Sequence, residues 1–81
     1  MRRFWTITSP QDLAHALKGY RLHRQLTQKE LADAIGMRQA TVSAFERSPE
    51  KAKADTVFRI LTALHLKLTL TCRNRKISLE D

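Results

Sequence analysis

The side chains with the clearest chemical use lie between positions 38 and 43, where the sequence is Arg-Gln-Ala-Thr-Val-Ser. A glutamine amide can bond N6 and N7 of adenine together, an arginine can bond O6 and N7 of guanine, and an alanine or threonine methyl can contact the thymine methyl. A serine hydroxyl can bond a base or a phosphate. The candidate base-reading residues are Arg38, Gln39, Ala40, Thr41 and Ser43. The alternative is that they form the solvated face of an amphipathic helix.

Gln28 is a candidate for holding a phosphate. It stands at the start of a predicted helix, where its side-chain amide can act together with backbone N–H groups. A contact of this kind fixes the register of a protein on nucleic acid but does not discriminate between bases.

Four helices are predicted to position these side chains. Ser9, Pro10 and Asp12 form a helix start, with a hydroxyl N-cap, a proline whose missing N–H costs nothing, and an acid at the positive helix end. Thr27 and Glu30 form a capping box. Apolar residues at spacings of three and four then predict helices over about residues 10–24, 27–35, 38–47 and 54–64, so that residues 9–65 are helical overall.

The connections between these helices have their own signals. Gly36 is expected to end the second helix because glycine adopts a positive φ without strain. Ala32 is expected where the second and third helices cross closely, since a larger side chain would push them apart. Residues 48–51, Ser-Pro-Glu-Lys, are predicted to form a loop.

After the fourth helix the pattern changes to a period of two, which predicts a half-buried strand over residues 66–73. A lone strand leaves its backbone unpaired, so this one needs a partner edge. Its apolar residues are Leu66, Leu68, Leu70 and Cys72. Residues 74–81 carry little apolar weight and are predicted to be a tail.

Composition excludes several classes of protein. A chain of 81 residues fits a single domain, 1–81, whose isolated core would be marginal. One cysteine excludes an internal disulfide, and three scattered histidines give no zinc-site spacing, so oligomerisation remains as a means of stabilisation.

No paired carboxylate site or glycine-rich phosphate loop is visible, so we expect neither an enzyme nor a cofactor. No apolar stretch approaches the roughly 18 residues of a membrane span, and we expect a cytoplasmic protein.

The charge is basic overall but unevenly distributed. Lys and Arg number 15 against 8 Asp and Glu, which gives a net charge of +7 and suggests a polyanionic partner. Residues 27–53 carry only five of the positive and four of the negative charges, so their net charge is +1. Most of the excess therefore lies outside the segment with the candidate base-reading residues, where it would add attraction that does not depend on DNA sequence.

Two short helices joined by a glycine-containing turn describe a helix-turn-helix. The segments Thr-Gln-Lys-Glu-Leu-Ala (27–32), Ile-Gly (35–36), Gln-Ala-Thr-Val-Ser (39–43) and Phe-Glu (45–46) resemble the Xre-like, phage-repressor-type helix-turn-helix family. With its Ser-Pro opening and its terminal Leu-Lys-Leu-Thr-Leu-Thr segment, the sequence is most similar to HipB-type antitoxins. The resemblance implies an all-α, compact four-helix repressor-like domain, with one C-terminal strand that pairs across a homodimer.

The resemblance also assigns roles to individual residues. Arg21 and Glu46 are similar to a buried ion pair that ties the first helix to the end of the third in relatives. Three basic residues lie where relatives contact the DNA backbone: Arg47, Lys51 and Lys53. The alternative for these three is a solvated loop, since loop charges are usually hydrated.

The function that the resemblance implies is a homodimeric transcriptional repressor of a palindromic operator in double-stranded DNA. HipB-like antitoxins also bind a HipA-like Ser/Thr kinase toxin and autoregulate the shared toxin-antitoxin operon. The tail departs from the HipB-like pattern because it has no terminal aromatic residue to fill a toxin pocket. Two alternatives remain open, a stand-alone Xre-family regulator and a protein-interaction module without DNA binding.

Overall fold

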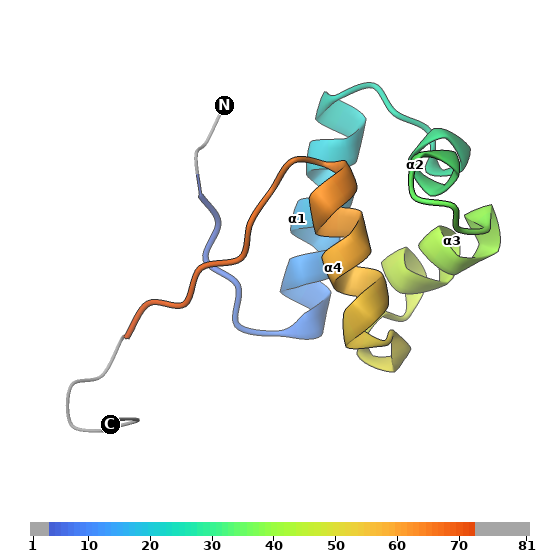
Figure 1. Cartoon of the computed structure of the whole chain (residues 1–81). Helices are drawn as coiled ribbons and strands as arrows, with labels where there is room; N and C mark the ends of the chain where they lie inside the picture. The colour runs from blue at the N-terminus through green and yellow to red at the C-terminus, as the bar shows by residue number, and fades with distance from the viewer. Residues whose placement is uncertain (1–3, 73–81) are drawn as a thin grey trace.

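The computed structural model describes residues 4–72, so the predicted tail and Arg73 lie outside the described residues. Its elements are α1 (Pro10–His23), α2 (Gln28–Ala34), α3 (Gln39–Arg47), the short 3-10 helix η1 (Pro49–Lys51) and α4 (Ala54–Ala63), as Figure 1 shows. The four predicted helices are confirmed, with ends that differ by at most one residue. The segment predicted as a loop instead contains η1, since Pro49 has a φ suited to a helical first position.

The first two helices begin at the predicted caps. The Ser9 hydroxyl accepts a hydrogen bond from the Asp12 backbone N–H at 3.0 Å. At α2, the Thr27 hydroxyl accepts from the Glu30 N–H at 3.0 Å while the Glu30 carboxylate accepts from the Thr27 N–H at 2.8 Å. Both bonds of the capping box are therefore present, and they satisfy amide groups that the helix itself leaves without partners.

Three helices end in the same way, with one residue in the left-handed region. Gln25, Gly36 and His65 have φ values of 59°, 62° and 59°. In each case the N–H of this residue bonds the carbonyl three residues earlier, and the next N–H bonds the carbonyl five residues earlier. This is a Schellman motif, which satisfies carbonyls at the helix end. The residue that follows each of these positions packs against the core: Leu26, Met37 and Leu66.

The left-handed positions predict opposite effects for two substitutions. Gly36→Ala is expected to lower the free energy of unfolding by about 1–2 kcal/mol, because a Cβ is strained at this φ. His65→Gly is expected to raise it by about 0.5–1 kcal/mol, since glycine relieves the same strain at an exposed site. Urea unfolding followed by circular dichroism measures both changes. If the free energy of unfolding rose in both variants or fell in both, the assignment of these helix ends would be contradicted.

One hydrophobic core joins the four helices. Its buried members are Ala14, Leu17, Leu31, Ala32, Val42, Phe45, Ile60, Leu61 and Leu64. Ala32 and Val42 are fully buried, and α2 and α3 pack closely against each other. The full burial of Ala32 agrees with the expectation of a small residue at this helix pair.

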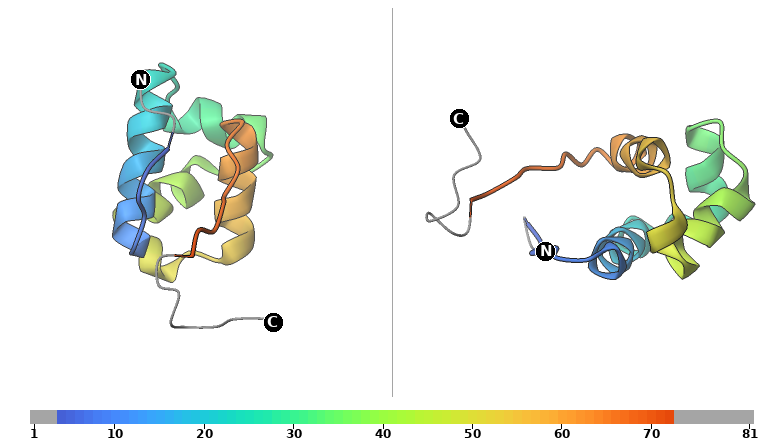
Figure 2. Two further views of the ribbon diagram at one scale, coloured as in Figure 1. Left: turned by 90° about the vertical axis from the view of Figure 1, so that its left-hand side faces the viewer. Right: turned by 90° about the horizontal axis from the view of Figure 1, so that it is seen from below.

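Segments 4–8 and 66–72 lie on one side of the α1–α4 pair, opposite α2 and α3 (Figures 1 and 2). Segment 4–8 runs along α1 and is anchored there, because the Thr8 N–H and hydroxyl donate to the Asp12 carboxylate at 3.1 and 3.0 Å. These bonds hold the pKa of Asp12 below its ordinary value. The anchor is complete above the ordinary pKa of aspartate and is lost as the pH falls through the lowered pKa.

Segment 66–72 begins after the end of α4 and extends away from the helices (Figures 1 and 2), and none of its residues is assigned to a strand. Leu66 packs against the core, whereas Leu68 is 48% exposed and Leu70 is 92% exposed. The predicted half-burial of this segment is therefore limited to its first residue in the single chain. A strand is defined by hydrogen bonds to a neighbour, so the strand prediction requires a second edge.

Candidate nucleic-acid interface

The five candidate base-reading residues lie at the N-terminus and on the outer surface of α3. Arg38, Gln39 and Ala40 are exposed, and Thr41 and Ser43 are partly exposed. Val42 and Phe45 point into the core and are 0% and 2% exposed. About one turn of α3 therefore presents hydrogen-bond donors, hydrogen-bond acceptors and a methyl group at the surface, where a DNA groove could receive them.

A buried ion pair connects α1 to the C-terminal part of α3. Arg21 Nε donates to Glu46 Oε2 at 2.8 Å and Arg21 Nη2 donates to Glu46 Oε1 at 3.1 Å. The two side chains are only 6% and 7% exposed. Arg21 Nη1 also donates to the Leu26 carbonyl at 2.7 Å, so the guanidinium fixes the loop after α1 as well. The predicted Arg21–Glu46 pair is present and ties α1 to the end of α3.

Gln28 joins this pair to the candidate base-reading face. Its Nε2 donates to Glu46 Oε1 at 2.9 Å, and its Oε1 accepts from Gln39 Nε2 at 3.5 Å. The predicted phosphate-holding side chain is thus fixed within the protein, next to Gln39. The separation of 18 residues between Gln28 and Glu46 carries no sequence signal, and sequence reasoning missed this link.

Of the candidate backbone-binding residues, Arg47 contacts the candidate base-reading face. Arg47, Lys51 and Lys53 are exposed, and Arg47 Nη1 donates to the Ser43 hydroxyl at 3.5 Å. Lys53 is the N-cap of α4, which has no side-chain cap, as α3 has none. Uncapped helix N-termini carry N–H groups and a partial positive charge that suit phosphate.

A second missed contact fixes the turn between α2 and α3. Arg59 on α4 donates from Nη2 to the carbonyl of Ile35, the C-cap residue of α2. A cation at the C-terminal end of a helix also interacts favourably with the helix dipole. The start of the turn is thereby held to α4. A contact between residues 24 positions apart follows no helical or strand spacing, so sequence patterns do not reveal it.

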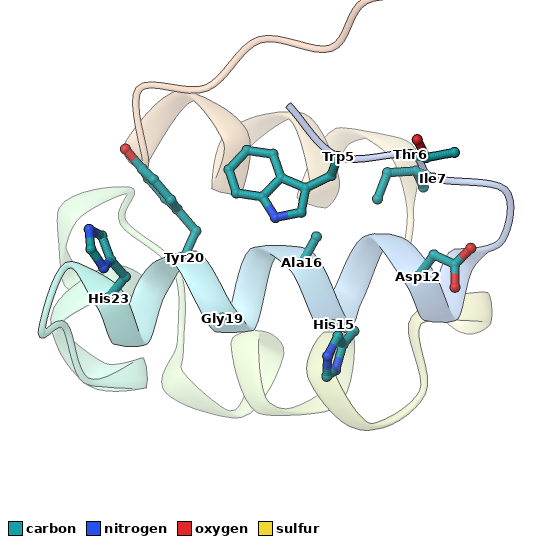
Figure 3. A pocket seen from close by; sticks show the side chains of 9 residues that line it. All are labelled: Trp5, Thr6, Ile7, Asp12, His15, Ala16, Gly19, Tyr20 and His23. Atoms are coloured by element: carbon teal, nitrogen blue, oxygen red, sulfur yellow. The ribbon is translucent and has the colours of Figure 1, made fainter. Parts of the chain in front are cut away.

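A separate open hollow of about 420 Å³ lies between segment 4–8 and α1 (Figure 3). Trp5 lies edge-on to Tyr20 there, with ring centroids 5.7 Å apart and an interplanar angle of 85°. Trp5 packs on α1 because the course of segment 4–8 places it above that helix. Trp5 therefore helps to hold this segment against α1.

No group of three or more His, Cys, Asp or Glu that could hold a metal ion occurs within residues 4–72. Over the same residues, no helix has the length and apolar character needed to cross a membrane.

Comparison with known proteins places the chain in a family. The helix-turn-helix family matches residues 17–70. Antitoxin HipB of Escherichia coli strain K12 is 46% identical over 70 residues, which cover 86% of this chain and 80% of HipB. The chain belongs to the helix-turn-helix family and, within it, to the HipB antitoxins. Antitoxin HigA1 of Mycobacterium tuberculosis strain H37Rv is similar over a shorter region, with 45% identity over 58 residues that cover 72% of this chain and 39% of HigA1.

Solved structures of HipB antitoxins have the same fold. A chain of the HipA-HipB-O2-O3 complex matches with a TM-score of 0.84 and 44% identity, covering 88% of this chain and 100% of that chain. A chain of the HipB-O4 20mer complex gives the same values. The expected repressor-like helical fold is therefore confirmed.

Proposed function

We propose that this protein is a homodimeric, sequence-specific transcriptional repressor of the antitoxin type, acting on a palindromic operator in the cytoplasm. The observation that carries the proposal is the exposed face of α3, whose donors and acceptors lie over a buried Arg21–Glu46 pair in a HipB-like fold. A partner protein groove would require apolar anchors on this face instead.

The proposal includes a HipA-like Ser/Thr kinase toxin as partner and autoregulation of a shared operon. It is supported by HipB itself, which is 46% identical and is part of a HipA-HipB-O2-O3 complex. Helix-turn-helix antitoxins are not an enzyme family, and we propose no catalytic role for the chain. A stand-alone regulator would have the same DNA-binding face but no affinity for such a kinase, and co-purification with the toxin separates the two.

We further propose that residues 66–72 form a strand that pairs with its copy across a two-fold axis. Leu68 and Leu70 are exposed in the single chain and would be covered by pairing. The segment lies on the side of the molecule opposite α3, so dimerisation leaves the candidate interface open (Figure 2). The pairing would set two α3 helices about 34–36 Å apart, over successive turns of one groove.

In this arrangement α3 enters the major groove. Arg38, Gln39, Ala40, Thr41 and Ser43 would contact base edges, with Gln39 on adenine as its most specific contact. The backbone contacts would come from Gln28, Arg47, Lys51 and Lys53 together with the uncapped helix N-termini.

Gln39→Ala is expected to weaken operator binding by about 1–3 kcal/mol and to relax the preference at one base pair in each half-site. Fluorescence anisotropy with single-substituted operator duplexes measures both effects. Gln11→Ala is the matched control, since Gln11 is exposed on α1 and bonds Glu50 of η1, and neither residue is a candidate for reading bases or binding the DNA backbone. An equal loss of affinity for operator and scrambled duplex would make Gln39 a backbone contact.

A further inference from the structure

Segment 66–72 carries apolar side chains away from the body of the protein without covering them. The segment extends away from the helices (Figures 1 and 2). Leu66, Leu68 and Leu70 share one face of it, because successive side chains of an extended chain point to opposite sides. Leu66 packs against the core, but Leu68 and Leu70 are 48% and 92% exposed. The outer part of this apolar face is therefore uncovered in the single chain.

Pairing of two such segments does not by itself cover this face. A two-stranded ribbon satisfies backbone groups between its strands, but it is marginally stable in water unless its apolar face packs against another element. The proposed dimer therefore needs an apolar surface beneath the ribbon, on the same side of the α1–α4 pair as segment 66–72.

The hollow between segment 4–8 and α1 offers such a surface on that side (Figures 2 and 3). Its floor includes Gly19, where an added Cβ would meet no atom within 4 Å. A glycine inside a helix costs stability, but it leaves room for another chain to approach closely. The apolar side chains that line the hollow are Trp5, Ile7, Ala16 and Tyr20.

We propose that the hollow of each protomer receives the partner's Leu70, which packs against Trp5 and over Gly19. The exchange is reciprocal across the two-fold axis, so each hollow is completed by a side chain of the other copy. The inference rests on the proposed homodimer and adds to strand pairing a contact between one protomer's segment 66–72 and the other's α1. The protomer's own Leu70 does not fill its hollow, since that side chain is 92% exposed.

Gly19→Leu tests the proposal with a substitution that the single chain tolerates. Leucine favours a helix more than glycine does, and its Cβ meets nothing within 4 Å, so the fold is retained. The new side chain occupies the place of the partner's Leu70, and the dimer has two such places. Because burial of one leucine changes an equilibrium constant by roughly tenfold or more, we expect the dimer dissociation constant to rise about 10²-fold or more. Sedimentation equilibrium measures this constant, and circular dichroism verifies the fold.

Gln11→Leu is the matched control, because it adds the same side chain to α1 at an exposed position that does not line the hollow. It should leave the dissociation constant unchanged. A double-mutant cycle then tests direct contact. Leu70→Ala weakens the dimer in the wild-type background, but it should cost much less in the Gly19→Leu background, where the hollow is already filled.

Trp5 gives an optical readout of the same contact, since it is the one tryptophan of the chain. The partner's Leu70 would remove water from the indole ring. The emission of the wild-type protein should therefore shift to shorter wavelength as its concentration rises through the dimer dissociation constant. Leu70→Ala should reduce this shift at concentrations where sedimentation shows a dimer.

Three results would each overturn the inference: a Gly19→Leu protein with the wild-type dissociation constant, additive effects of Gly19→Leu and Leu70→Ala, or a Trp5 emission that is the same in monomer and dimer. Failure of the proposed dimer is distinguishable, because the wild-type protein would then sediment as a monomer at every concentration.

Discussion

Arg21→Ala is expected to lower the free energy of unfolding by about 3–5 kcal/mol, because it leaves a buried carboxylate without its countercharge. The Glu46 side chain is only 7% exposed, and Gln28 is the one other side chain among residues 4–72 with a hydrogen bond to it. The Leu26 carbonyl loses its donor as well. Since native domains are stable by only about 5–15 kcal/mol, the loss is a large fraction of the total. Urea unfolding at one fixed protein concentration measures it, because dimerisation makes stability depend on concentration.

Lys29→Ala is the matched control for this result. Lys29 Nζ bonds Asp33 at 3.0 Å, but the two side chains are 69% and 65% exposed. An exposed pair of this kind contributes about 0–1 kcal/mol. Similar losses for Arg21→Ala and Lys29→Ala would contradict a structural role for the buried pair. Replacing both Arg21 and Glu46 by apolar residues of similar volume is expected to recover much of the loss, since no buried charge then remains.

Leu68→Lys combined with Leu70→Lys is expected to convert the dimer to a monomer. Pairing would cover these side chains, and lysines in their place would have to lose hydration beside their copies in the partner subunit. Two linked half-site contacts typically bind about 10²–10⁴ times more tightly than one, so operator affinity should fall by about that factor while half-site affinity is preserved. Sedimentation velocity and anisotropy with full and half operators measure the two effects.

The control for this double variant is Leu22→Lys with Phe58→Lys. These residues are 55% and 53% exposed and lie on α1 and α4, outside segment 66–72. The control adds the same charge, so it separates dimer disruption from a general electrostatic change. A Leu68→Lys, Leu70→Lys protein that sediments as a dimer would refute the strand-mediated interface.

Local sequence signals predicted the helices well. The N-caps at Ser9 and Thr27 form the bonds that their residue types indicate, and Gly36 ends its helix with a positive φ. The ends after α1 and α4 were less visible, because Gln25 and His65 take the left-handed conformation without being glycine. At those two positions, the packing of the following leucine against the core accompanies a conformation that the residue type does not favour.

The candidate site could be predicted only in part. Residue types and helical spacing placed Gln39 and its neighbours on the outer face of α3, with Val42 and Phe45 inward. The contacts that orient them are tertiary and leave no periodic signal, as with Gln28 on Glu46 and Arg59 on the Ile35 carbonyl. The strand prediction stays a prediction, since the pairing edge that it requires is itself only proposed to come from a second copy of the chain.

The most direct test of the proposed DNA recognition is the affinity of the wild-type protein for its selected palindromic duplex and for a scrambled duplex of the same length, measured across a salt series. We predict that the palindrome binds at least about 10³-fold more tightly at physiological salt, and that both affinities fall as salt rises. Equal affinity for the two duplexes, or no binding to either at low salt, would contradict sequence-specific recognition by α3.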